Sequence, residues 1–70
     1  SLHYLGEGRY ASTMIGQKFL LNEKGQALLS ETFDYLSPFY KGLSIVRKDS
    51  LYGVIRKDGS WLLELRFRHI

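Results

Sequence analysis

The sequence predicts an all-β fold, an antiparallel meander of short hairpins in about two 34-residue repeats. Three observations predict it. Short apolar runs alternate with polar stretches that end in glycine, which is the pattern of strands joined by tight turns. No apolar series with the i, i+3, i+4, i+7 spacing of a helix survives the frequent glycines. Finally, Gly25 and Gly59 close similar polar turns at a 34-residue offset.

Two hairpins give the clearest local signal, one over residues 20–29 and one over residues 54–63. In each, a polar stretch ending in glycine separates two apolar runs, as in a type I turn closed by a residue in the left-handed region. Glycine suits that last position because it takes a positive φ without a Cβ clash. Further turns are expected at Gly16-Gln17 and at residues 48–50. The glycines that we assign to structural turns are Gly25, Gly42, Gly53 and Gly59.

The strands expected from these boundaries lie near residues 9–15, 18–21, 26–29, 43–47, 51–55 and 60–64. The remaining connection, residues 30–42, is rich in aromatic side chains and too apolar for a mobile loop. We expect it to pack over one sheet face and to allow one short helical turn around residues 30–40. Pro38 should set a turn there and block strand pairing, because proline has no backbone N–H.

Length and composition limit the organisation to a single domain. The chain has 70 residues, 44% of them hydrophobic and 14% aromatic, which is enough for a folded core. Such a small domain buries only about 60% of the surface that its unfolded chain exposes. The absence of cysteine excludes disulfides, thiolate metal sites and cysteine nucleophiles. A neighbouring repeat or a partner is therefore expected to supply part of the burial.

The 34-residue offset extends beyond the two hairpins. It pairs Gly8 with Gly42, and it pairs apolar positions with apolar positions. Such a period is typical of repeat arrays, in which one unit cannot bury its apolar face alone. We divide the single domain 1–70 into the tail of a preceding unit (1–18), a unit (19–52) and a partial unit (53–70). The partial unit should leave Phe67 and Ile70 without a covering strand.

Residues 39–46 and 51–63 resemble the WG-repeat family, which is common in bacteria. Tyr52-Gly53 stands where that family has its Trp-Gly dipeptide, and the earlier unit has Lys18-Phe19 there. Both units also lack the prolines that usually follow the second strand. The resemblance covers about two units and implies a β-repeat that serves as an interaction or scaffold module within a larger protein.

Charge and aromatic residues suggest where a partner would bind. Residues 1–40 carry three cations and four anions, whereas residues 41–70 carry seven cations and three anions. A basic half of this kind suits nucleic acid or an acidic protein surface, although strand edges often carry such charges. Of the aromatic residues, Phe19, Phe33, Phe39 and Phe67 are expected in the core. The candidate partner contacts are Trp61, Tyr40, Tyr52, Arg56, Arg66 and Arg68.

The groups that an enzyme would need are not patterned in this sequence. His3 and His69 lie near opposite ends and have no patterned carboxylate beside them, and no ligand spacing suggests a metal. Asp49 and Asp58 fall in turns, where aspartate is favoured for its backbone hydrogen bonds. The Gly-x-Gly at residues 6–8 is too short for a phosphate-binding loop. We therefore expect a protein that is not an enzyme and needs no cofactor.

The main hypothesis is a non-catalytic module for protein–protein interaction or scaffolding, with self-association of this stretch or contact with adjoining repeats. The alternative is nucleic-acid binding through the basic C-terminal half, and a third hypothesis is carbohydrate binding through tyrosine and tryptophan. No apolar run exceeds three residues, so no membrane span is expected. Ser1 in place of methionine suggests an excerpt of a longer protein. Without a signal peptide the compartment stays open, with a slight preference for the cytoplasm.

Overall fold

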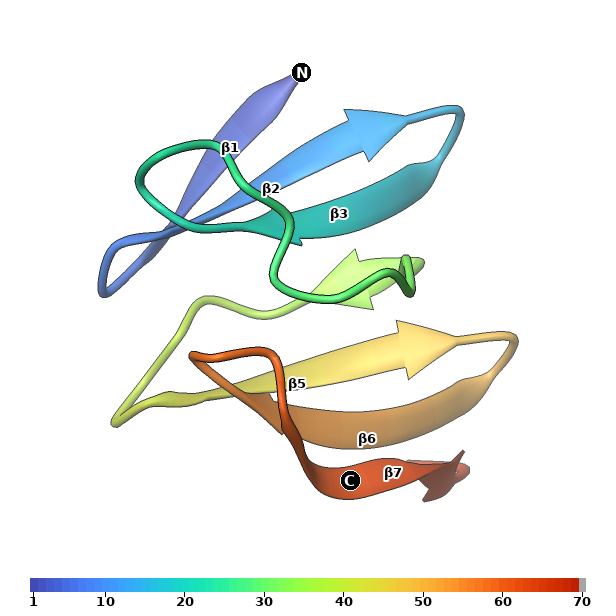
Figure 1. The fold of residues 1–70 in the computed structure, drawn as a ribbon. Coiled ribbons are helices and arrows are strands. Elements are labelled where there is room, and N and C mark those ends of the chain that lie inside the picture. The colour runs from blue at the N-terminus through green and yellow to red at the C-terminus, as the bar shows by residue number, and fades with distance from the viewer. Residues whose placement is uncertain (70) are drawn as a thin grey trace.

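The computed structural model describes residues 1–69, which form seven antiparallel strands in two stacked sheets (Figure 1). The first sheet contains β1 (Leu2–Gly6), β2 (Arg9–Met14) and β3 (Gln17–Leu21). The second contains β4 (Tyr35–Leu36), β5 (Leu43–Lys48), β6 (Leu51–Arg56) and β7 (Trp61–Phe67). Strands follow chain order in both sheets. The predicted all-β meander is thus confirmed, and residues 30–40 contain no helical turn.

Four tight turns show the repeat at the level of the backbone. Each has a positive φ at both central residues, as in the type I′ turns that match the twist of paired strands. The turns are Glu7-Gly8, Ile15-Gly16, Lys41-Gly42 and Asp49-Ser50. The first and third are related by the 34-residue offset, and so are the second and fourth, so both hairpins of the first sheet recur in the second.

The turns at Gly25 and Gly59 are also alike. The φ angles are 79° and 88°, and each glycine N–H donates to the carbonyl three residues earlier, on Asn22 at 3.0 Å and on Arg56 at 2.9 Å. Gly42 likewise lies in a turn. Gly53 does not, contrary to our assignment, because it lies inside β6. Glycine is needed there for space: a Cβ would lie 2.6 Å from the carbonyl oxygen of Leu63.

Five of the six expected strands correspond to β2, β3, β5, β6 and β7. The expected strand at residues 26–29 does not form, because only Ala27 bridges to Leu21 before the chain bends. Two strands were not expected. β1 was interpreted only as the tail of another unit, and β4 lies in the aromatic connection. β4 stops at Leu36, just before Pro38, where a backbone donor is missing.

The core lies between the two sheets, and both sheets contribute to it. Its buried members are Leu5, Ala11, Leu20, Phe33, Leu36, Phe39, Val46 and Ile55. Phe33 is fully buried and meets the Trp61 ring edge-on, with centroids 5.8 Å apart. Of the four phenylalanines expected in the core, Phe33 and Phe39 are buried, Phe19 is half-buried and Phe67 is exposed. Ile70 lies outside the described residues.

In the folded chain we call residues 1–34, with the first sheet, the first unit and residues 35–69, with the second sheet, the second unit. The chain passes from the first unit to the second along the free edge of β3. Lys18 pairs there with Phe33, and Leu21 pairs with Ala27. In the second unit, β6 makes the corresponding pairs one repeat further along the chain, between Tyr52 and Phe67 and between Ile55 and Trp61. Residues 27–33 are therefore the first unit's counterpart of β7. Beyond Phe33 the chain crosses to the second sheet and pairs with β5 as β4.

Candidate interaction surface

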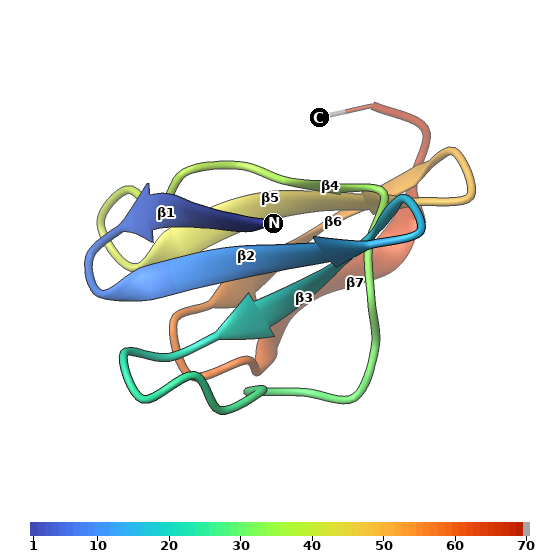
Figure 2. The same cartoon turned by 90° about the horizontal axis from the view of Figure 1, so that it is seen from above.

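Each sheet has one side turned to the core and one turned away from it, because side chains alternate across a strand. We call the outer side of the first sheet the N-terminal face and the outer side of the second sheet the C-terminal face. Figure 2 looks down on the N-terminal face, with the second sheet lying beneath the first. The two faces are opposite ends of the stack.

The C-terminal face is apolar and solvent-exposed. Strand pairing places on it Leu43, Ile45, Tyr52, Val54, Leu63 and Phe67. Leu43, Leu63 and Phe67 are exposed, while Val54 at the centre is nearly covered by its neighbours. Residues Pro38 and Tyr40 join this face to form a shallow groove beside Leu43, Ile45 and Val54. A patch of this kind on a small protein is typical of an interaction site.

Three of the six candidate contact residues belong to this surface or its rim. Tyr52 is half-buried on it, between Arg47 and Phe67. Arg56 pairs with Leu43 at the end of β6, and Tyr40 is 72% exposed beside the turn. The ammonium of Lys41 stands 5.5 Å from the centre of the Tyr40 ring, a cation–π arrangement.

Trp61 lies on the opposite side of β7 and is half-buried against the core. Its ring packs on Phe33 and would touch any Cβ at Gly53. The structure therefore separates Trp61 from the other candidate contacts. Arg66 and Arg68 are exposed, the first within β7 and the second just beyond it.

Sequence analysis did not single out Leu43, Ile45, Val54 and Leu63 as surface residues. A signal was present, because the 34-residue offset aligns the last three with Ala11, Leu20 and Leu29, which pack in the core between the sheets. The outer face of the second sheet thus repeats the inner face of the first. To recognise this relation, one must know which side of each sheet is covered, and the sequence alignment alone does not give that information.

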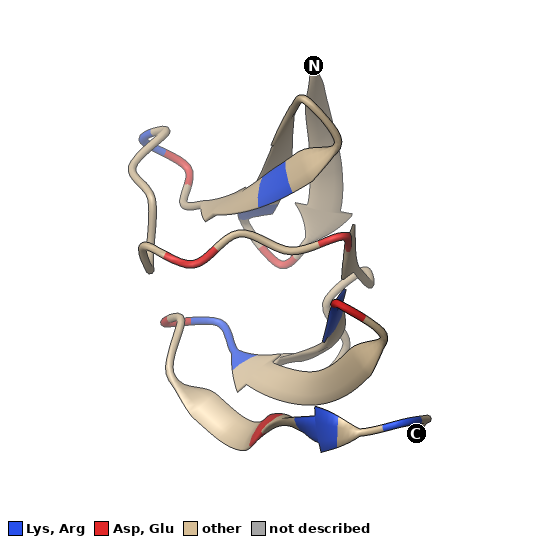
Figure 3. Ribbon diagram, turned by 90° about the vertical axis from the view of Figure 1, so that its right-hand side faces the viewer, with Lys and Arg blue, Asp and Glu red and all other residues tan. Residues whose placement is uncertain are grey.

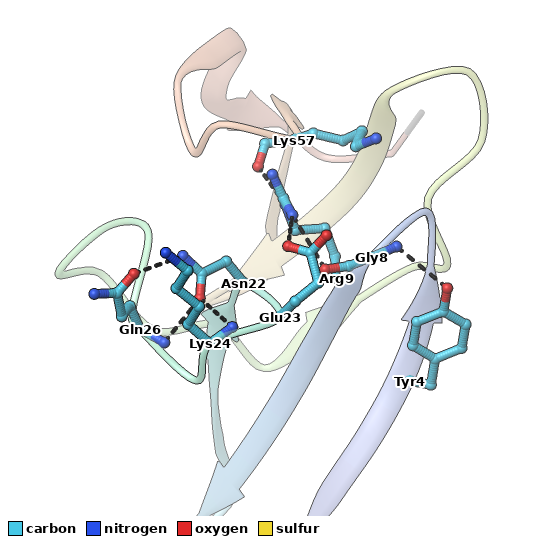
Figure 4. A network of polar contacts seen from close by, with 8 residues as sticks. All are labelled: Tyr4, Gly8, Arg9, Asn22, Glu23, Lys24, Gln26 and Lys57. Atoms are coloured by element: carbon cyan, nitrogen blue, oxygen red, sulfur yellow. Dashed lines mark hydrogen bonds and ion pairs between the residues drawn. The ribbon is translucent and has the colours of Figure 1, made fainter.

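Polar contacts at the turns join the two units. The Glu7 carboxylate accepts the N–H groups of Lys41 and Gly42, both at 2.9 Å. Arg9 extends across to the second unit, where its Nε donates to the carbonyl of Lys57 at 2.7 Å (Figure 4). Arg9 also forms an ion pair with Glu23 at 3.1 Å. The Glu23 backbone N–H and the Arg9 guanidinium together hold the pKa of the Glu23 carboxyl below its usual range.

Two aspartates organise the neighbouring turns. Asp34 accepts a hydrogen bond from the Gln17 side chain at 2.9 Å and another from the Asp49 N–H at 3.0 Å. These bonds hold the pKa of Asp34 below its ordinary value. Asp58 accepts from the hydroxyl and the N–H of Ser60, which lowers the pKa of Asp58 as well. The carboxylates of Asp34 and Asp58 are thus used as hydrogen-bond acceptors that stabilise turns.

Figure 3 shows the charged residues spread over turns and strands of both units. One arginine, Arg66, lies in β7, and Arg68 follows it. Several cations of the basic half have partners within the chain. The Lys48 ammonium donates to the Thr32 carbonyl at 3.0 Å, and the Arg56 guanidinium donates to the Trp61 carbonyl at 2.8 Å. These two cations are therefore partly committed to intramolecular contacts.

No three His, Cys, Asp or Glu side chains within residues 1–69 converge in a way that could hold a metal ion. His3 lies in β1 and His69 follows β7, and both are exposed. The same residues include no helix able to cross a membrane.

Taken together, the fold defines a class of protein: a β-repeat in which two similar antiparallel units stack face to face. Residues 20–52 match the family model described as the WG containing repeat. The resemblance predicted from the sequence is therefore confirmed over these residues. Comparison with curated proteins and with solved structures gives no match.

Proposed function

We propose that this repeat module is non-catalytic and works by binding other protein chains through its exposed apolar sheet surface. The observation that carries the proposal is the C-terminal face, where Leu43, Leu63 and Phe67 are exposed around the nearly covered Val54. Burying such side chains against a partner gains roughly 25 cal/mol for each Å² removed from water. Scaffolding within a larger protein is the biological form that this activity would take.

The residues around the patch support a protein partner. Tyr40, Tyr52 and Arg56 lie on or beside the apolar surface. Tyrosine and arginine are enriched in the centres of protein–protein interfaces, where they combine contact area with hydrogen bonding. The engaged carboxylates Asp34 and Asp58, which accept hydrogen bonds within turns, leave little basis for acid–base catalysis at the same site.

A photo-crosslinking amino acid placed at position 63 of the full-length protein, in the cells that make it, tests the proposal. Its matched control is the same amino acid at position 15, because Ile15 is fully exposed but lies at a hairpin tip away from both faces. We expect covalent protein adducts from position 63 and few from position 15, identified by mass spectrometry. Equal yields, or no protein adduct from position 63, would overturn the proposal.

The alternative is nucleic-acid binding by the basic half, for which exposed Lys41, Arg66 and Arg68 are the available cations. Commitment of Lys48 and Arg56 to chain carbonyls weakens this alternative. It is tested by a gel shift with random single-stranded and duplex oligonucleotides at about 50 mM salt, where phosphate contacts are strong. A shift that disappears as salt rises would favour the alternative.

A further inference from the structure

We infer that the C-terminal face of one copy is built to receive the N-terminal face of a second copy, so that the protein associates head to tail. This inference rests on the proposed function, and it names the partner as another copy of the same chain. It follows from comparing the contact between the two units with the surfaces at the two ends.

The contact inside the molecule joins two different surfaces. The first unit contributes Ala11, Leu20, Leu29 and Phe33, and the second contributes Leu36, Val46, Ile55 and Trp61. Because the surfaces differ, the units are related by stacking in one direction, not by a two-fold axis. Such heterologous contacts leave one unsatisfied surface of each kind at the two ends.

The two end faces are the counterparts of these two buried surfaces. The 34-residue offset turns the first unit's buried set into Ile45, Val54, Leu63 and Phe67, which all lie on the C-terminal face. The reverse shift turns the second unit's buried set into Leu2, Ser12, Leu21 and Ala27. Leu2 and Ser12 are paired across the first sheet, and Leu2 is 66% exposed. The C-terminal face thus resembles the buried surface of the first unit, and the N-terminal face resembles the buried surface of the second unit. The two end faces are therefore expected to fit each other.

A specific contact between Leu28 and Gly59 shows how the units interlock. The backbone of Leu28 lies over Gly59, where a Cβ would be 2.7 Å from the Leu28 carbonyl oxygen. The counterparts are Leu62, which is 45% exposed, and Gly25, which has nothing within 4 Å of the same position. Gly25 borders a groove on the N-terminal face together with Leu2, Tyr10 and Leu21. In a head-to-tail pair, Leu62 of one copy would cover Gly25 of the next.

Charge favours the same arrangement. The half that carries the N-terminal face has one net negative charge, and the half that carries the C-terminal face has four net positive charges. At the turns, Lys41 occupies in the second unit the position that Glu7 occupies in the first. In a stack, Lys41 would therefore approach the turn of the next copy that contains Glu7, which is a pair of opposite charges.

Sedimentation velocity of four proteins tests the inference. Gly25→Asn blocks the N-terminal face, because asparagine tolerates a positive φ and its side chain fills the groove. Leu63→Glu blocks the C-terminal face. Gly16→Asn is the matched control, since Gly16 has a φ of 75° and open space but lies at a hairpin tip. Wild type is the reference, studied up to about 1 mM, where even a contact of about −4 kcal/mol is half-formed.

We expect the average mass of wild type and Gly16→Asn to grow with concentration beyond a dimer. Each blocked variant alone should stay monomeric, while their equimolar mixture should form one-to-one dimers and stop there, because each variant retains one intact face. Circular dichroism verifies folding, and Leu2→Glu replaces Gly25→Asn if that variant does not fold. A wild type that is monomeric throughout, a dimer that does not grow, or a mixture that fails to pair would overturn the inference.

The crosslinking experiment separates this inference from the proposed function. Suppose that position 63 crosslinks only to other proteins and that the wild type is monomeric. This result would support the proposed function and overturn head-to-tail association. Adducts joining position 63 to the N-terminal face of another copy support both.

Discussion

At several positions in this fold, the distance to a neighbouring backbone determines whether a residue larger than glycine can fit. Gly25 and Gly59 have the same turn geometry and the same hydrogen bond, yet only Gly59 is covered by a neighbouring segment. Gly53 has an ordinary φ and is required only because the β7 backbone and the Trp61 ring occupy the space of a side chain. Glycine therefore serves two separate purposes in the repeat, turn geometry and close packing.

The two equivalent turn glycines give a matched pair of substitutions. Gly25→Ala should cost about 1–2 kcal/mol in the free energy of unfolding, since alanine is strained at positive φ. Gly59→Ala carries the same strain and in addition forces Leu28 away from the turn, at a further cost of about 1–3 kcal/mol. Urea unfolding followed by circular dichroism measures both. Equal losses would show that Leu28 does not pack on Gly59 in solution.

Asp34 should make stability depend on pH. Its pKa in the folded protein is depressed by the hydrogen bonds from Gln17 and from the Asp49 N–H. In the unfolded chain the carboxyl of an aspartate has a pKa of about 4. Because the pKa of Asp34 is lower in the folded protein, ionised Asp34 stabilises the fold above about pH 4, and this stabilisation is lost as the pH falls through the pKa of the folded state. Urea midpoints between about pH 5 and pH 2 should therefore fall more steeply for wild type than for Asp34→Asn.

Glu31→Gln is the control for this pH dependence, because no hydrogen bond or ion pair holds the Glu31 side chain among residues 1–69. Its urea midpoints should follow the wild-type curve across the acid range. If Asp34→Asn kept the full wild-type slope, the Asp34 contacts would not be formed in solution.

At the scale of elements, local sequence predicts the hairpins but not the two edge strands β1 and β4. Strands β5 and β6 are short apolar runs flanked by turn residues, so local sequence determines them. β4 has two residues and exists only because β5 is beside it, and β1 lacks a strong apolar pattern. Residues 26–29 match their counterpart in β7 closely in sequence, but the chain bends over residues 28–30, between the bridges that Ala27 and Phe33 make to β3. Whether these segments form strands depends on pairing with segments far away in the sequence, and the local pattern of residues does not reveal that pairing.

The same limit applied to the candidate site. Of the candidate partner contacts, Tyr40, Tyr52 and Arg56 lie on or beside the C-terminal face, whereas Trp61 belongs to the core side of β7. Regular alternation would place Trp61 and Leu63 on the same side of β7. The irregular register opposite Val54 and Ile55 instead puts them on opposite sides, with Trp61 paired to Ile55 and packed on Phe33.

The two sides of β7 should therefore respond differently to mutation. Trp61→Ala removes the half-buried ring that covers Phe33 and should lower the free energy of unfolding by about 2 kcal/mol or more. Leu63→Ala, on the exposed side, should change it by no more than about 0.5 kcal/mol. Urea unfolding followed by circular dichroism suits both variants. A larger loss for Leu63→Ala would reverse the assignment of the two sides.

At the scale of the whole molecule, neither sheet has a core of its own. The buried cluster takes Ala11 and Leu20 from the first sheet and Val46 and Ile55 from the second. Removing either sheet would expose the apolar side of the other, so each unit depends on its neighbour for stability, as in other stacked repeats. This dependence links the internal contact to the proposed association, because both use the same kind of surface.

Shared burial predicts that the two sheets unfold together. Val46→Ala creates a cavity on the second sheet, yet it should speed amide hydrogen exchange in β2 as much as in β6, because global unfolding is then the common opening step. Exchange followed by NMR at Ala11 and Ile55 measures the two sheets separately. Ile15→Ala, at a fully exposed hairpin tip, is the control and should leave both rates unchanged. Acceleration confined to the second sheet would mean that the units open independently, and stacking would then contribute little to the stability of either one.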